Sequence, residues 1–235
     1  MSRPVRPRDA AGLVLLRRGA SGSEVLMGRR HAKARFLPGI LVFPGGCLEA
    51  QDHRPSGFEE RFAPAPAGLD AATRRKFKGL VRCALRETWE ETGVLVGQPA
   101  AAKQANGSAG VWRAFAESGL APALQRPRLL ARAITPAGSP IRFHTRFFLA
   151  ETDEAVGNRA VHDQAGDGEL DGVSWMPTDK ALAEDLIDVT RFMLERALSA
   201  GASDPAPLFH YRAETRLIDL DGRRLHWEEP LAAQI

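Results

Sequence analysis

The stretch "RETWEETGV" (residues 86–94) places one arginine and three glutamates immediately before a glycine. On a helix that advances 100° per residue, Glu90 lies about 60° to one side of Glu87 and Glu91 about 40° to the other. Like charges this close repel and raise one another's pKa values, which Arg86, one i,i+4 step before Glu90, offsets only in part. This face predicts a hard, oxygen-ligated divalent cation such as Mg²⁺, with a solvated acidic surface helix as the alternative.

The surrounding pattern predicts an α/β (α+β) fold with one mixed sheet. The apolar stripe Leu80, Ala84, Leu85 and Thr88 predicts a helix from about residue 71 to 92, which ends at a left-handed Gly93. Periodicity and turn residues predict strands at 12–19, 24–30, 39–46, 94–96, 127–135, 141–151 and 172–176, helices at 111–119 and from 177 onward with a break, and a hairpin at Asp221-Gly222. Residues 52–70 and 97–110 fit no regular element, and we interpret them as insertions or linkers.

Composition suits one globular domain over residues 1–235, since 44% of the residues are hydrophobic and 26% are charged. Cys47 and Cys83 lie far apart with no CxxC spacing, which favours a reducing compartment and two ordinary small residues. The apolar run Ala10–Leu16 is too short for a membrane span and is wrongly flanked for a signal peptide. We therefore expect a cytoplasmic protein with no membrane partner.

Positive charge gathers at the N-terminal end. Residues 1–35 hold nine Lys or Arg against Asp9 and Glu24, although the net charge of the whole chain is only +3. This asymmetry indicates either an anionic ligand held between the basic segment and the carboxylate helix, or a solvated basic face. No lysine-rich tail or aromatic-interleaved basic stretch points to nucleic acid. A homodimer stays open, because the sequence does not determine the oligomeric state.

Two separated pieces of the chain together resemble the signature of the Nudix hydrolases. In that family a glycine, a carboxylate six residues later and an "REUxEExGU" helix form a loop-helix-loop site; here Gly46, Asp52 and residues 86–94 match. Asp52 replaces the usual glutamate, and Thr88 replaces a bulky aliphatic residue. Thirty-three residues, 53–85, stand where the family pattern has seven. A family branch related to peroxisomal coenzyme A diphosphatases carries an insertion at this place, and we put the insertion in this chain at about 53–78. Residues 181–235 are interpreted as a C-terminal helical and hairpin extension of the same domain.

The resemblance implies a Nudix-like mixed sheet sandwiched between helices, and hydrolysis of a nucleoside diphosphate linked to another group. It implies a Mg²⁺ or Mn²⁺ site at Glu90, Glu91 and Gly46, with Glu87 as a further ligand or as the residue that positions the attacking water. Arg86 orients Glu87 or Asp52 by hydrogen bonds. A general base often comes from a later loop in this family. Glu169 is the candidate, with a solvated loop carboxylate as the alternative; Asp163 and Asp171 are weaker rivals, and His144 is either core or site lining.

The segment "LMGRRHAKARFLPGILVFPGG" (residues 26–46) resembles an extra motif of coenzyme A pyrophosphohydrolases. The resemblance predicts coenzyme A or an acyl-CoA as substrate, with Arg30, Arg35, Gly45 and Gly46 as binding residues, because arginines suit the 3′-phosphate. A general hydrolase of nucleotide sugars, ADP-ribose or NADH is the alternative. A non-catalytic Nudix-fold binding module typically loses one or more of the helix glutamates, all of which are present here. An unrelated α/β protein with a coincidental acidic helix is the third alternative.

Overall fold

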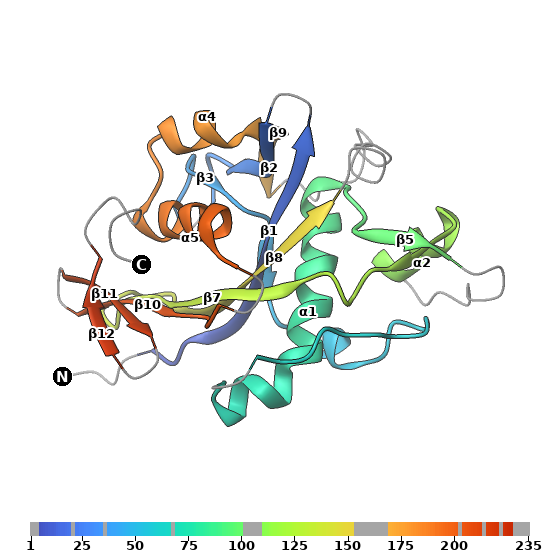
Figure 1. Cartoon of the computed structure of the whole chain (residues 1–235), viewed down its shortest axis with the longest axis horizontal. Coiled ribbons are helices and arrows are strands. Elements are labelled where there is room, and N and C mark those ends of the chain that lie inside the picture. The colour runs from blue at the N-terminus through green and yellow to red at the C-terminus, as the bar shows by residue number, and fades with distance from the viewer. Residues whose placement is uncertain are drawn as a thin grey trace.

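A mixed sheet runs through the centre of the molecule with helices on both faces (Figure 1). The computed structural model describes residues 5–19, 22–34, 37–66, 69–100, 110–152, 169–201, 204–212, 215–220 and 223–227. The helical elements are η1 (Ala50–His53, a 3-10 helix), α1 (Ala71–Thr92), α2 (Val111–Glu117), α4 (Thr178–Ala183) and α5 (Asp188–Ser199). The strands of the first half are β1 (Arg8–Gly19), β2 (Gly22–Arg30), β3 (Leu41–Val42), β4 (Gly45–Cys47) and β5 (Gly97–Pro99). Those of the second half are β6 (Leu120–Pro122), β7 (Arg128–Ile134), β8 (Phe143–Thr152), β9 (Leu170–Pro177), β10 (Leu208–Arg212), β11 (Thr215–Leu220) and β12 (Arg223–His226).

The long strand β1 organises the ten-stranded sheet, whose order is β12-β11-β10-β7-β8-β1-β2-β3, with β4 added to β1 and β9 added to β2. One edge of β1 pairs along most of its length with β8 in parallel. The other edge is divided, because β4 pairs antiparallel with residues 10–12 and β2 pairs antiparallel with residues 16–19. A short strand, β4, is thereby held beside the centre of the sheet.

Apolar cores cover both faces of the sheet. On one face α1 and α2 pack over Leu13, Leu15 and Phe148, and on the other α5 packs over Val14, Leu16 and Leu149. The apolar run at residues 10–16 is buried along its whole length because both faces of β1 are covered. Within the described part of the chain, no helix is both long and apolar enough to cross a membrane.

Helix α1 has the boundaries that the sequence predicts. Asp70 caps its start by accepting a hydrogen bond from the Thr73 main-chain N–H at 2.8 Å. Its apolar stripe faces the core, where Leu80, Ala84 and Leu85 are fully buried. Gly93 ends the helix in the left-handed conformation at φ 72°, and its N–H donates to the Trp89 carbonyl.

The mixed α/β fold with a sheet between helices is confirmed, but two predicted strands are wrong in their boundaries. The strand predicted at 39–46 is two strands on different partners, since Pro44 has no N–H to continue a ladder and its carbonyl accepts from the Leu13 N–H instead. The strand predicted at 94–96 is wrong, because Val94–Val96 are buried as irregular chain and β5 starts only at Gly97, inside the predicted linker 97–110. Residues 71–78, which the approximate insertion included, form the first two turns of α1.

Gly93→Ala should destabilise the protein by about 1 to 2 kcal/mol, because an L-residue with a Cβ is strained at positive φ. Urea unfolding followed by far-UV circular dichroism measures the change. Gly138→Ala is the matched control, since a Cβ there meets no atom within 4 Å and the residue has no positive φ. Equal stability of the two variants would contradict the capping role of Gly93.

Candidate active site

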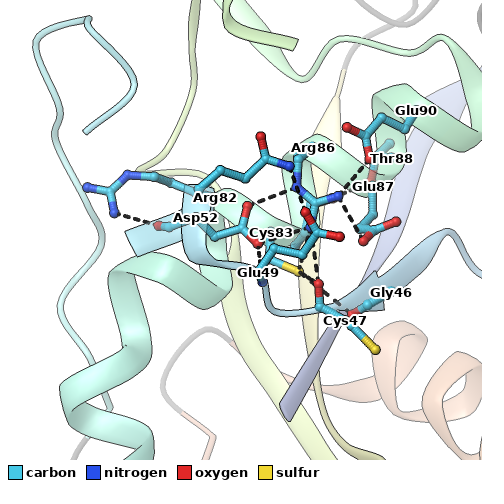
Figure 2. A network of polar contacts seen from close by, with 12 residues as sticks. Gly46, Cys47, Glu49, Asp52, Arg82, Cys83, Arg86, Glu87, Thr88 and Glu90 are labelled. Atoms are coloured by element: carbon cyan, nitrogen blue, oxygen red, sulfur yellow. Dashed lines mark hydrogen bonds and ion pairs between the residues drawn. The ribbon is translucent and has the colours of Figure 1, made fainter. Parts of the chain in front are cut away.

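The C-terminal half of α1, strand β4 and η1 meet around the guanidinium of Arg86 (Figure 2). Arg86 is 3% exposed and forms a bidentate ion pair with Asp52, in which Nε donates to Oδ1 at 2.9 Å and Nη2 donates to Oδ2 at 3.0 Å. Asp52 is 1% exposed, and its Oδ2 also accepts from the Glu49 main-chain N–H at 2.8 Å. The predicted contact between Arg86 and Asp52 is therefore present, and it joins the loop that follows β4 to the helix.

The same guanidinium also holds two of the helix carboxylates. Nη1 donates to Glu90 Oε2 at 2.6 Å and lies 2.9 Å from Glu87 Oε1. Nη2 donates to the Cys47 carbonyl at 3.1 Å. Burial opposes the charge of Arg86, but the hydrogen bonds to Asp52 and the field of Glu87 outweigh it and raise its pKa above the usual value. Arg86 thus stays charged and fixes the direction of its neighbours.

Strand β4 approaches the helix closely because it carries two glycines. A Cβ on Gly46 would overlap the Glu87 carboxylate, whereas a Cβ on Gly45 would lie 2.6 Å from the Ala11 carbonyl oxygen of β1. The Gly45 N–H donates to Glu91 Oε2 at 2.7 Å. Gly46 therefore permits the close approach of β4 to the helix, whereas Gly45 is required by the contact with β1.

Burial and mutual repulsion make this cluster costly as a set of free carboxylates. Burial is the largest cause that raises the pKa of Glu87 to about 7; Glu90 and Asp52 add to the rise, and Arg86 opposes it. The pKa of Glu90 is also raised, again chiefly by burial. A cation held among these side chains would favour their charged forms.

The donor set suits a hard divalent cation, although the side chains are turned to other partners. Among the described residues, no group of three or more His, Cys, Asp or Glu stands in a geometry that could hold a metal ion. Glu87 and Glu90 face Arg86, and Glu91 faces the Gly45 N–H. All three offer oxygen, the donor that Mg²⁺ and Mn²⁺ prefer. The three predicted glutamate ligands therefore lie close to one another on α1 and offer suitable donor atoms.

The remaining predicted site residues lie at the paired ends of β2 and β9 or outside the described residues. Glu169 is exposed directly before β9, where its carbonyl accepts from the His31 N–H at 3.0 Å. Arg30 is half-buried at the end of β2, and its Nε is buried without a hydrogen-bond partner among the described residues. Asp171 pairs with Arg29 across these two strands and is exposed. Arg35 and Asp163 lie outside the described residues.

His144 lies in a different polar cluster, beneath the first turns of α1. Its neighbour Arg146 is 1% exposed and bonds Asp9 and the Thr73 hydroxyl. Burial, with the charge of Arg146 next, lowers the pKa of His144 to about 4. Thr73 and Glu87 are about 20 Å apart along the helix at 1.5 Å per residue. His144 therefore shares a face of β8 with Arg146, which contacts the start of α1, and it lies away from Glu87.

Sequence reasoning missed Arg82 and Glu60, which adjoin the site. Arg82 is 5% exposed, one turn before Arg86, and its Nε donates to Glu60 Oε1 at 2.8 Å. The i,i+4 spacing of two arginines on a helix face that also carries the apolar stripe is a signal for Arg82. Glu60 had no such signal, because it lies in a segment without regular structure.

Comparisons with known proteins agree with this geometry. No family model matches the chain. It is 31% identical over 101 residues to the acyl-coenzyme A diphosphatase NUDT19 of Xenopus laevis, a match that spans 34% of this chain and only 27% of that protein. It is also similar to the crystal structure of a NUDIX hydrolase from Alicyclobacillus acidocaldarius, with a TM-score of 0.64 and 29% identity over 83% of this chain and 93% of the other.

In the metal-free protein, the contribution of Glu87 to the stability of the folded state should fall as pH rises from about 4.5 to about 7. Glu87 has a raised pKa in the folded state, so folding favours its protonated form, and this contribution is fully present below pH 4.5 and lost by pH 7. The loss amounts to at most about 3 kcal/mol. Glu87→Gln should remove it, so that the variant gains relative to wild type as pH rises. Unfolding in EDTA at several pH values measures this; a pH-independent difference between the two proteins would contradict it.

Proposed function

We propose that this chain is a Nudix hydrolase and that it hydrolyses the pyrophosphate bond of a nucleoside diphosphate linked to another group. In this reaction a water molecule attacks one phosphorus, the bond from that phosphorus to the bridging oxygen breaks, and two phosphate products leave. The observation that carries the proposal is the joining of Gly46, Asp52 and the helix glutamates around one buried arginine. Asp52 and Arg86 are separated by thirty-three residues, 53–85, yet their side chains are in contact.

The residue roles follow from the contacts. Glu87, Glu90 and Glu91, with the Gly46 carbonyl, would hold a divalent cation, Mg²⁺ or Mn²⁺, which when bound supplies charge stabilisation to the phosphates and acidifies water. Arg86 orients Glu87 and Glu90 and is itself fixed by Asp52. Glu169 is our proposed general base, since it lies in an exposed position beside the end of β2.

For the substrate we propose coenzyme A or an acyl-CoA, cut to 3′,5′-ADP and the corresponding phosphopantetheine. The partial match to an acyl-coenzyme A diphosphatase supports this choice, as does the resemblance of residues 26–46 to the coenzyme A motif. Within that segment, Arg30 has a buried Nε without a partner among the described residues, so a donor is free to meet an anionic group. Arg35 is proposed to bind the same 3′-phosphate.

The sequence leaves two alternative functions. A hydrolase that is general for nucleotide sugars, ADP-ribose or NADH would use the same carboxylates without the arginine contact. A non-catalytic binding module would keep the fold, but the three glutamates and their orienting arginine favour catalysis.

We further propose a cytoplasmic location, which suits Cys47 and Cys83, both free thiols in the structure.

Glu90→Gln and Glu91→Gln should each lower kcat on the order of 100-fold or more, because a neutral amide replaces a charged group that would hold the cation. Mg²⁺ should raise the Tm of the wild-type protein, since a ligand bound only by the folded state stabilises it. The matched control is Glu117→Gln, which removes the charge from another i,i+4 pair, with Arg113, whose two side chains are exposed; it should leave both quantities unchanged. Wild-type kcat in either site variant at saturating Mg²⁺ would remove that residue from the site.

The substrate assignment predicts that kcat/KM for coenzyme A exceeds that for its 3′-dephospho form by roughly tenfold, the worth of one charged hydrogen bond. Arg30→Ala should abolish this preference for coenzyme A over its 3′-dephospho form. Arg35→Ala tests the second arginine that is proposed to bind the 3′-phosphate, and it should reduce the same preference. Arg29→Ala should keep it, since Arg29 is exposed and is already paired with Glu184 at 2.6 Å. Mass-resolved products identify the bond that is cut. Equal efficiency for the two substrates, or faster turnover of ADP-ribose, would leave the general hydrolase.

A further inference from the structure

The segment between η1 and α1 is bound to the helix by a buried ion pair. Arg82 Nε donates to Glu60 Oε1 at 2.8 Å, and Arg82 Nη2 bonds Glu60 Oε2, so the contact is two-pronged. The side chains of Arg82 and Glu60 are only 6% and 13% exposed. Glu60 Oε1 also accepts from the Ser56 N–H at 2.8 Å. Both partners are thus held in one geometry, unlike an exposed surface pair.

Arg82 also contacts the residue that orients the site. Its Nη1 donates to the Asp52 carbonyl oxygen at 3.1 Å, while the carboxylate of Asp52 holds Arg86 (Figure 2). One path of contacts therefore runs from Glu60 through Arg82, Asp52 and Arg86 to Glu87 and Glu90. It connects a segment outside the motif to the carboxylates proposed to bind the metal.

Charge explains why the path is sensitive to Glu60. Arg82 and Arg86 are like charges one helical turn apart, and both are almost fully buried. Each requires its own carboxylate, because an unpaired buried charge is strongly unfavourable. The Glu60 carboxylate pairs with Arg82, and the Asp52 carboxylate pairs with Arg86. Without Glu60, the buried charge of Arg82 would lack its carboxylate, and we expect Arg82 to compete with Arg86 for Asp52, whose main-chain carbonyl oxygen it already contacts at 3.1 Å.

We propose that Glu60 and Arg82 are positioning residues for the metal-binding carboxylates, so that the inserted segment sets the affinity of the site for its divalent cation. By occupying Arg82, Glu60 keeps Asp52 bound to Arg86, and Arg86 then keeps Glu87 and Glu90 in place. The proposal rests on the proposed function, but it can be tested by metal binding without any turnover.

The experiment compares Mn²⁺ binding to the full-length wild-type protein and its variants, measured by electron paramagnetic resonance of free Mn²⁺. Glu60→Gln keeps the size of the side chain and removes its charge, and should weaken Mn²⁺ binding about tenfold or more. Glu59→Gln is the matched control, since its pair with Arg61 is exposed at 58% and 79%, and it should bind Mn²⁺ as wild type does. In hydrolysis assays, the Mg²⁺ concentration for half-maximal rate should rise in Glu60→Gln while the substrate KM at saturating Mg²⁺ stays constant.

A second variant separates positioning from mere support of the segment. If Arg82 competes for Asp52 when Glu60 is lost, then Glu60→Gln combined with Arg82→Gln should bind Mn²⁺ more tightly than Glu60→Gln alone. Simple addition of two losses would overturn the proposal, and so would a Glu60→Gln protein with lowered Tm but wild-type Mn²⁺ affinity. Where Glu60→Gln alone does not fold, the double variant decides, because it carries no charge at 82 that competes for Asp52 and should bind Mn²⁺ about as tightly as the wild type does. Hydrolysis of no substrate by the wild type would refute the proposed function while the Mn²⁺ data still decide the positioning role.

Discussion

The buried ion pair between Arg86 and Asp52 is the constraint on which the site depends. Two charges removed from water are tolerated only when their hydrogen-bonding capacity is met, and here it is. Asp52 accepts from Arg86 and from the Glu49 N–H, while Arg86 reaches Asp52, two glutamates and the Cys47 carbonyl. Any shift of the loop against the helix would leave several of these groups unsatisfied at once. The pair therefore fixes the register between them.

The sheet brings the loop to the place where this pair can form. Because β1 is twelve residues long, its free edge accommodates both β2 and β4, and β4 starts the loop that leads to Asp52. The buried apolar residues of β1 require helices on both faces, so α1 packs directly over the strand that carries β4. Glycine at 46 then removes the side chain that would overlap Glu87. Core packing and site geometry are thus set by the same strand.

The long segment between the two halves of the motif is integrated into the fold. Loop-closure entropy rises only slowly with length, so thirty-three residues in place of seven carry a modest cost. The segment offsets this cost by burial, because Phe58 packs edge-on against Phe115 at 6.4 Å in the main core. Residues 71–85 form the N-terminal part of α1. Through Glu60 it also reaches the polar network. An insertion that supplies a buried counter-charge becomes part of the structure around the site.

Local pattern alone determined the long elements of this protein. Helix α1, its end at Gly93, the strands β1, β2, β7 and β8, and the later helix with its break all follow from periodicity and cap residues, which depend on neighbours in sequence. The grouping of Arg86 with Glu87, Glu90 and Glu91 is local in the same way, because helix geometry places residues four apart on one side.

Tertiary structure decided what depends on partners distant in sequence. Strands of a few residues have too little periodicity to be recognised in the sequence. The strand edge that each segment pairs with therefore decided the split of residues 39–46 into β3 and β4 and the formation of the short strands β5, β6 and β10. Burial decided which partners the polar side chains have. Glu91 accepts from the Gly45 N–H, Arg82 pairs with Glu60, and His144 lies near Arg146 on β8. A charge in water needs no particular partner, whereas a buried charge must find one, and only the folded chain determines which partner is within reach.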